Sequence, residues 1–304
     1  MERYNKLNNF LKDKFGERVL KICIDGGFSC PNRDGTCGYG GCIFCSEQGS
    51  GEHILYKDIA KQVTNHLASY RGKRANKFIA YFQNFSNTYE KVEILKKKYD
   101  SALISDKIVA LAIATRPDCI DEEKVKLIKT YQDKYFVWVE LGLQSANEKT
   151  ANFINRGFSN QQFTEAVSLL KKYNIPVVVH IMVGLPGENI EDIKNTVIFL
   201  NRHDIWGLKI HSTYIVENTK LAKLYFDNKY QPIELDEYID DVVYILSHIN
   251  KDIVIHRISG DAPKNKLIAP AWNAHKKWII NGVNKRLTVE DIYQGMFYSE
   301  QKTN

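Results

Sequence analysis

Short runs of consecutive apolar residues, many of them β-branched, recur along the chain and alternate with segments of helical periodicity. Runs of this kind are typical of strands that are buried on both faces of a parallel sheet. The pattern predicts strands at residues 19–25, 77–83, 108–115, 136–143, 175–183, 207–216 and 252–259. Cys23 lies within the first of these runs, so we expect its side chain to be buried.

Most of the intervening segments place apolar residues three or four positions apart, which is typical of amphipathic helices. They predict helices at residues 56–70, 121–131, 159–174 and 189–203. Ser159 is the expected N-cap of the third helix. Alternating strands and helices predict a parallel sheet built from right-handed βαβ units. Periodicity alone does not distinguish a barrel from an open doubly wound sheet.

Polar motifs favour the barrel, because they follow five of the predicted strands where each strand ends. They are a cysteine-rich loop after the first strand, then QNFSNTY (83–89), TRPD (115–118), GLQS (142–145) and GLPGE (184–188). In a barrel of this type the chemistry collects at the C-terminal ends of the strands. We therefore expect an α/β fold, with a partial (β/α)6 TIM-type barrel at residues 1–217. Residues 218–304 are expected to form a mostly helical C-terminal extension packed on it.

The composition is that of an ordinary globular protein, with 304 residues, 44% of them hydrophobic, and a formal net charge of +6. The N-terminus lacks the apolar segment of a signal peptide, and no run approaches the ~18 apolar residues of a membrane span. We therefore expect a cytoplasmic protein without a membrane span. Basic residues concentrate at 71–77 and 264–286, the second stretch together with Trp272 and Trp278. Such stretches bind RNA, or they form a solvated face above two core tryptophans.

Four of the six cysteines are clustered after the first predicted strand. In a reducing cytoplasm, clustered cysteines indicate metal ligands or redox groups rather than disulfides. Cys42 and Cys45 form a C-x2-C pair, which binds one zinc ion or part of an iron–sulfur cluster. Cys30 or Cys37 would supply a third ligand, whereas a closed zinc site would use all four cysteines.

The cysteine-rich loop has an aromatic residue immediately before its last cysteine, and it resembles that of the radical S-adenosylmethionine (SAM) superfamily. Several motifs are more closely similar to the YtqA/YhcC family, which is related to Elongator-protein-3-like radical SAM proteins. They are IDGGF (24–28), CPNRDGT (30–36), YGGCIFC (39–45), YFQNFSNTY (81–89), ATRPD (114–118), ELGLQS (140–145) and GLPGE (184–188). The resemblance covers residues 5–290, nearly the whole chain.

This resemblance implies that Cys30, Cys42 and Cys45 hold a [4Fe-4S] cluster and leave one iron open for S-adenosyl-L-methionine. Reductive cleavage of SAM would give a 5′-deoxyadenosyl radical that removes a hydrogen atom from the substrate. Cys37 falls at a variable position of the family pattern, but its spacing from Cys42 keeps it as a rival third ligand. Candidates for quenching the product radical, on their chemistry only, are Tyr81, Tyr89, Tyr214 and Cys119.

The same resemblance implies which residues contact SAM. They are Gln83 and Asn84 at the methionine amino group, Glu140 and Gln144 at the ribose or methionine end, Arg156 at the carboxylate, His180, and Gly184 and Gly187 near the adenine. Local alternatives remain open for several of them. Glu140 would pair with Arg156. Gln144 would cap a helix, and His180 would be a core histidine.

The resemblance also implies a substrate, the wobble uridine 34 of tRNA. The expected reaction trims 5-carboxymethylaminomethyl-(2-thio)uridine to 5-aminomethyl-(2-thio)uridine ahead of a partner tRNA methyltransferase. A flavodoxin- or ferredoxin-type protein would donate the electron, and the stretches 71–77 and 264–286 would contact the tRNA. One alternative is a radical SAM enzyme for a small-molecule or protein substrate. Another is a non-enzymatic iron–sulfur or zinc-binding module.

Overall fold

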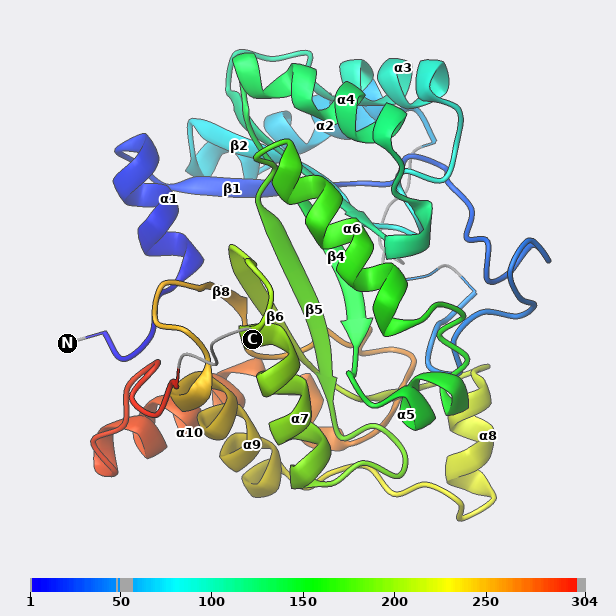
Figure 1. Ribbon diagram of the computed structural model, residues 1–304. Coiled ribbons are helices and arrows are strands. Elements are labelled where there is room, and N and C mark those ends of the chain that lie inside the picture. The colour runs from blue at the N-terminus through cyan, green and yellow to red at the C-terminus, as the bar shows by residue number, and fades with distance from the viewer. Residues whose placement is uncertain (1, 48, 50–56, 300–304) are drawn as a thin grey trace.

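The main sheet is a single curled layer of seven parallel strands (Figure 1). The computed structural model describes residues 2–47, 49 and 57–299. The strands are β1 (Val19–Ile24), β2 (Lys77–Phe82), β3 (Ile108–Thr115), β4 (Phe136–Gln144), β5 (Val177–Val183), β6 (Gly207–Ser212) and β8 (Val254–Arg257). Their spatial order follows the chain. A doubly wound sheet would reverse its order at a switch point, so the predicted partial barrel is confirmed.

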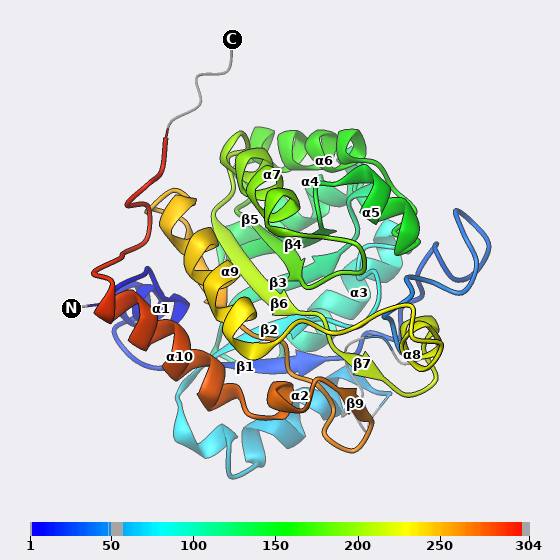
Figure 2. The same ribbon diagram turned by 90° about the horizontal axis from the view of Figure 1, so that it is seen from below.

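Helices connect successive strands and cover the convex face of the sheet (Figure 2). They are α2 (Ile59–Ala68), α3 (Val92–Ala102), α4 (Glu122–Thr130), α6 (Asn160–Lys172) and α7 (Ile190–Asn201). A short helix, α5 (Glu148–Phe153), instead lies at the C-terminal end of β4 (Figure 1). The first residue of the predicted helix 56–70 lies outside the described residues. Ser159 caps α6 in a reciprocal capping box with Gln162, as predicted. Asp58, Asp121 and Asn189 are the N-caps of α2, α4 and α7, and each side chain accepts a backbone N–H group of its helix.

Apolar side chains pack on both faces of the sheet. The larger core lies between the convex face and the helices, and a second core lies on the concave face. This second core includes Leu7, Leu11, Ala110, Ala112, Ala114 and Trp138. Its two leucines belong to α1 (Leu7–Phe15), which contacts both edge strands, β1 and β8. Helix α1 therefore closes the half-barrel at the N-terminal end of the strands.

The region after β6 is mostly helical, with α8 (Lys220–Phe226), α9 (Leu235–His248) and α10 (Lys276–Val289). The predicted strand 207–216 is wrong in its second half, because the chain leaves the main sheet after Ser212. Ile215–Val216 (β7) instead pairs antiparallel with Leu267–Ala269 (β9). Strand β8 extends the main sheet beyond residue 217. No helix in the described ranges is long and apolar enough to cross a membrane.

Candidate functional site

The cysteine-rich loop follows β1 and folds over the C-terminal edge of the sheet. The backbone N–H of Ser86, after β2, donates to the carbonyl of Ser29 at 3.2 Å. The N–H of Ile43 donates to the carbonyl of Ile154, after α5, at 3.0 Å. Gly41 has a φ of 72°, a conformation that glycine adopts without steric cost. The loop is therefore anchored at the edge where the polar strand-end motifs gather.

Cys30, Cys42 and Cys45 are electrostatic neighbours within this loop. Burial raises the pKa of Cys42 to about 12, and the charges of Cys45 and Cys30 raise it as well. Burial and Cys30 also raise the pKa of Cys45. Such thiols ionise readily only beside positive charge, which a bound metal cluster supplies. The amide of Asn32 lies 3.8 Å from the sulfur of Cys42 as a donor, so the loop suits a cluster held by thiolates.

Cys37 is exposed and contacts a different set of groups. Its Sγ lies 3.7 Å from Nη2 of Arg116 and 3.8 Å from the carboxylate of Asp118. Burial raises the pKa of Cys37, and the charge of Cys30 raises it further. Cys37 therefore lies close enough to Cys30 to remain a rival third ligand. Within the part of the chain that the structure describes, no three His, Cys, Asp or Glu side chains are grouped to hold a metal ion.

Buried polar side chains line the C-terminal edge of the sheet next to this loop. Asn84 is 1% exposed, and its Oδ1 has no hydrogen-bond partner among the described residues. The hydroxyl of Thr213 is equally buried and unpaired within those residues. An unpaired buried polar group costs about 1–3 kcal/mol, so these atoms are suited to a polar ligand. Gln83 lies half-buried beside Asn84, and its contact with SAM stays a prediction.

A buried charged cluster centred on Glu140 occupies the concave face. Oε1 of Glu140 accepts from the indole of Trp138 at 3.0 Å. Oε2 accepts from His180 at 2.8 Å and from the ammonium of Lys209, which also donates to the hydroxyl of Tyr81 at 3.0 Å. Burial would raise the pKa of Glu140, but Lys209 and His180 outweigh it and hold that pKa well below its usual range. Glu140 thus pairs with Lys209 rather than with Arg156.

Arg156 is fully buried, and its guanidinium is committed to protein acceptors. It donates to the carbonyls of Leu143, Ser145 and Phe158 and to the side chains of Glu148 and Asn160. These contacts engage both Nη atoms and Nε, which carry all five N–H donors of an arginine. Arg156 therefore fixes the turn after β4, and we do not assign it to SAM.

The remaining predicted residues have contrasting surroundings. Gln144 has a φ of 62°, which is uncommon for a residue other than glycine. It does not cap the next helix, because Asn147 is the N-cap of α5. A Cβ on Gly184 would lie 2.7 Å from Ile233, so this glycine accommodates the C-terminal region. Gly187 has a φ of 81° with open space around its Cα.

Lys209 and Arg116 belong to this site but are absent from the sequence-based prediction. Lys209 interrupts the apolar run GLKIHS, and a lysine within a strand buried on both faces is a signal for a paired internal charge. Arg116 lies in the TRPD motif and is 9% exposed. Its guanidinium pairs with Asp118 at 2.7 Å and donates to the carbonyl of Arg156 at 2.8 Å. It thereby ties the ends of β3 and β4 together.

The carboxylate of Glu188, in the GLPGE motif, makes folding stability depend on pH. Burial raises its pKa to about 7, although a hydrogen bond from Ser145 opposes this. An unfolded glutamate titrates near about 4.3, so the folded state holds this proton more tightly. Protonated Glu188 therefore contributes its full stabilisation of the fold below about pH 4.3, and this contribution is lost as the pH rises to about 7.

We expect the free energy of unfolding of the wild type, minus that of Glu188→Gln, to fall between those two pH values and to stay level above them. Urea unfolding at a series of pH values measures this difference. Glu93→Gln, on the exposed side of α3, controls for the loss of one carboxylate. A level Glu188→Gln difference across the range would contradict the assignment.

Two family models match the chain. The model of the radical SAM superfamily matches residues 34–200, more than half of the chain. The chain belongs to the radical SAM superfamily. The Radical_SAM C-terminal domain matches residues 205–288 of this radical SAM protein. Members of the superfamily bind a [4Fe-4S] cluster and SAM, which suits the thiol loop and the unpaired strand-end groups.

Relatives of this radical SAM protein confirm the predicted family. YtqA of Bacillus subtilis (strain 168) is 38% identical over 98% of this chain and 93% of its own length. YhcC of Escherichia coli (strain K12) is 35% identical over 90% of this chain and 88% of its own length. The tRNA uridine(34) acetyltransferase of Methanocaldococcus infernus is 30% identical, over 64% of this chain but only 34% of the acetyltransferase.

A solved structure confirms the fold. The archaeal Methanocaldococcus infernus Elp3, with residues 1–46 deleted, superposes with a TM-score of 0.70 at 19% sequence identity. The match covers 91% of this chain and 64% of that protein. The curled half-barrel and most of the C-terminal region therefore have a counterpart in a solved structure.

Proposed function

We propose that this radical SAM protein acts on the wobble uridine 34 of tRNA. The proposed reaction converts 5-carboxymethylaminomethyl-(2-thio)uridine to 5-aminomethyl-(2-thio)uridine. Oxidation of the methylene next to the carboxylate would give an imine, and water would hydrolyse it to the amine and glyoxylate. Cleavage of one SAM to methionine and 5′-deoxyadenosine would account for the two electrons. The similarity to a protein named tRNA uridine(34) acetyltransferase supports this nucleotide as the target. The observation that carries the proposal is the position of the two basic stretches, which both reach the concave face of the half-barrel beside β1.

The charges that act on two side chains of β1 support this position. Burial raises the pKa of Cys23, and Arg71 of the first basic stretch opposes that rise. Burial lowers the pKa of Lys21, and Lys276 of the second stretch lowers it further. Both stretches therefore approach the inward-facing side chains of β1. RNA bound to them would lie across the open side of the half-barrel and deliver a base to its concave face.

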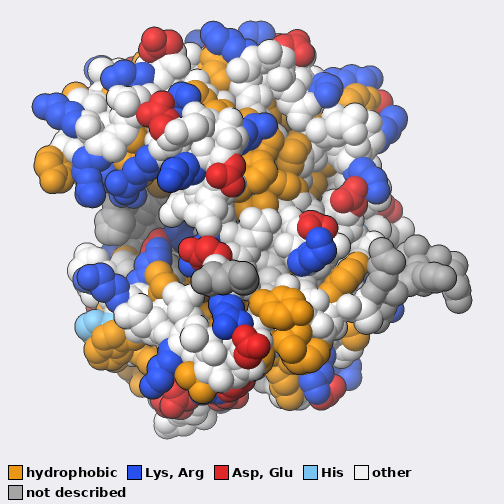
Figure 3. Space-filling model, turned by 90° about the vertical axis from the view of Figure 1, so that its left-hand side faces the viewer, with side chains coloured by type: hydrophobic (Ala, Val, Ile, Leu, Met, Phe, Trp, Pro, Cys, Tyr) orange, Lys and Arg blue, Asp and Glu red, His pale blue; other side chains and the backbone are white. Residues whose placement is uncertain are grey.

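The first stretch, residues 71–77, presents three exposed cations. Arg71, Lys73 and Arg74 are exposed, whereas Lys77 turns inward and donates to the carbonyl of Phe15 at 2.8 Å. Figure 3 shows Lys and Arg side chains on both halves of this side of the molecule, most densely at the upper left. Exposed cations at this density favour binding to a phosphate backbone.

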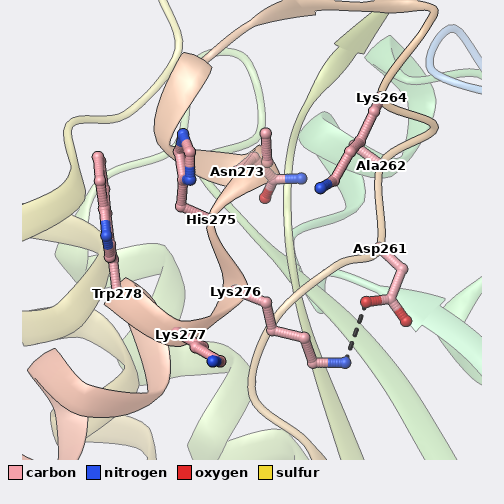
Figure 4. Close-up of a pocket in the computed structure, with 9 residues that line it drawn as sticks. Asp261, Ala262, Lys264, Asn273, His275, Lys276, Lys277 and Trp278 are labelled. Atoms are coloured by element: carbon pink, nitrogen blue, oxygen red, sulfur yellow. Dashed lines mark hydrogen bonds and ion pairs between the residues drawn. The ribbon is translucent and has the colours of Figure 1, made fainter.

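The second stretch contains a pocket of about 410 Å³ (Figure 4). Its lining includes Asp261, Lys264, His275, Lys276, Lys277 and Trp278. The rings of His275 and Trp278 stack with their centroids 4.1 Å apart, and Trp278 is 55% exposed. An exposed aromatic surface beside lysines suits nucleobase stacking. Trp272 is buried and donates to the carbonyl of Ile233, so Trp278 is the tryptophan of this stretch that we assign to RNA.

In this proposal Cys30, Cys42 and Cys45 hold the [4Fe-4S] cluster, and Gln83 and Asn84 bind the amino group of SAM. When bound, the two groups supply a 5′-deoxyadenosyl radical that abstracts a hydrogen atom from an unactivated C–H bond. The chain itself excludes water beneath the loop, where apolar side chains pack into a core of their own. A flavodoxin- or ferredoxin-type donor would supply the electron. A tRNA methyltransferase would then use the product as its substrate. We propose that both reactions take place in the cytoplasm.

A strain that lacks the gene tests this function. We expect its tRNA to keep the carboxymethylaminomethyl group at the wobble position and to lose the aminomethyl derivatives, which the wild-type gene restores. Mass spectrometry of digested tRNA measures both nucleosides. Unchanged aminomethyl derivatives would refute the tRNA substrate. Formation of 5′-deoxyadenosine by the reduced, reconstituted protein then separates a radical enzyme with another substrate from a non-enzymatic iron–sulfur module.

A further inference from the structure

Two lysines flank one tyrosine on the concave face of the half-barrel. The ammonium of Lys209, on β6, lies 4.4 Å from the centroid of the Tyr81 ring, and that of Lys21, on β1, lies 5.4 Å from the same centroid. Strands β1 and β6 are far apart in the order of the sheet, yet both lysines face the ring of Tyr81. Lys209 has its carboxylate partner in Glu140.

Lys21 has no such partner. Among the described residues, no carboxylate lies within ion-pair distance of its ammonium. The other acidic side chain near it is Asp261, which is already shared by Arg257 at 2.6 Å and Lys276 at 3.0 Å. Four cations thus face two carboxylates in this part of the molecule. Lys21 is half-buried, so its charge is only partly hydrated, and incomplete hydration of an uncompensated charge is costly. An anion from outside the chain would offset that cost.

The histidines of the concave face do not change this balance. Burial lowers the pKa of His180 to about 4 and lowers that of His211 well below its usual value. Both rings are therefore neutral near pH 7. Burial also lowers the pKa of Lys209 to about 7, but its contact with the ionised carboxylate of Glu140 favours the charged ammonium. Lys209 and Glu140 thus balance each other, and the excess positive charge belongs to Lys21. Burial also lowers the pKa of Lys21, and a bound anion would offset that effect.

The side chain of Lys21 is accessible to a ligand from solvent. Cys23, the next inward-facing residue of β1, is open to solvent on one side rather than fully buried as its apolar surroundings predict, although the protein around its thiol still desolvates it enough to raise its pKa. Lys21 itself is half-buried, so solvent reaches this side of the concave face. Strand β3 places the short side chains of Ala110, Ala112 and Ala114 in the concave core, and Val109 packs against that core.

We propose that Lys21 binds a carboxylate of the substrate on the concave face, opposite the Lys209–Glu140 pair. This proposal rests on the proposed function, in which the wobble uridine carries a terminal carboxylate on its carboxymethylaminomethyl group. A phosphate of the tRNA backbone is the other source of negative charge. The reacting methylene is adjacent to that carboxylate, so a fixed carboxylate would also orient the C–H bond. Lys21 thus distinguishes a uridine that carries the carboxymethylaminomethyl group from a uridine that lacks it.

Binding of two tRNA pools to the reconstituted, unreduced protein with SAM tests the assignment without turnover. One pool carries the carboxymethylaminomethyl group at uridine 34, and the other is an unmodified transcript. We expect the wild type to prefer the first pool and Lys21→Met to lose that preference, with affinity for the first pool falling on the order of 30-fold. Lys21→Arg should retain the preference. Lys97→Met, an exposed lysine of α3, should change nothing.

The outcomes separate this proposal from the function on which it rests. Equal weakening of both pools by Lys21→Met indicates a phosphate contact and overturns the carboxylate assignment, as does an unchanged preference. If the wild type shows no preference, N-methylglycine is titrated against the same proteins. If the wild type binds N-methylglycine and Lys21→Met does not, the carboxylate site stands and the tRNA substrate is rejected. If the wild type does not bind N-methylglycine, both are rejected. Circular dichroism and iron content confirm that each variant is folded and loaded.

Discussion

Replacing Cys30 with alanine is expected to abolish the iron–sulfur cluster and to reduce formation of 5′-deoxyadenosine at least about 100-fold, since loss of an outer-shell group alone costs about 10- to 100-fold. The variant would keep only two of the three proposed thiolates, and Cys42 and Cys45 cannot hold a four-iron cluster without the third. Iron and sulfide analysis measures the first effect. Chromatography of the products from reduced protein and SAM measures the second.

Cys37→Ala is the matched control, because it removes a thiol from the same loop. We expect it to retain both the cluster and the cleavage of SAM, since the sulfur of Cys37 is exposed and contacts Arg116 and Asp118. If the Cys30→Ala variant kept its iron–sulfur cluster and the Cys37→Ala variant lost it, Cys37 would be the third ligand. Electron paramagnetic resonance of the reduced proteins distinguishes an intact cluster from a degraded one.

Replacing Lys209 with methionine is expected to lower the free energy of unfolding by about 3–5 kcal/mol. Methionine has a similar length, so the loss comes from charge rather than from volume. Glu140 is fully buried and would lose the ammonium that neutralises it, while His180 is neutral near pH 7. Urea unfolding followed by circular dichroism measures the change.

The double variant Lys209→Met/Glu140→Gln isolates the cause of that loss. An amide in place of the carboxylate leaves no buried charge, so the double variant should be clearly more stable than Lys209→Met alone. If the two were equally destabilised, lost packing rather than an unpaired carboxylate would be responsible. Lys97→Met should stay within about 0.5 kcal/mol of the wild type, as expected of an exposed position.

Much of the fold follows from the sequence because burial on both faces leaves a direct trace in it. Strands in the centre of a parallel sheet need apolar side chains in both directions, so the runs at residues 108–115 and 136–143 are readable without any structure. The capping box at Ser159 is readable for a similar reason, since both of its partners lie within one turn. The strand-end motifs also revealed the edge at which the loop is anchored.

The errors arise where distant segments compete for the same residues. Ile215 and Val216 have strand character, but the partner that they pair with lies about fifty residues later, at β9. Cys23 is surrounded by apolar neighbours in sequence, yet it faces the open side of a half-barrel. No local pattern reports which edge of a sheet is left open.

The sequence by itself determined the strand rhythm, the family motifs and the cysteines available to a cluster, because each depends on residues close together in the chain. The tertiary structure decided how charges are paired. It placed Glu140 against Lys209, which is 69 residues away, and it used every donor of Arg156 on nearby protein groups. It also left Lys21 without a carboxylate at ion-pair distance among the described residues. A buried charge takes its partner from whatever strand lies across the barrel, and only the curvature of the sheet sets which strand that is.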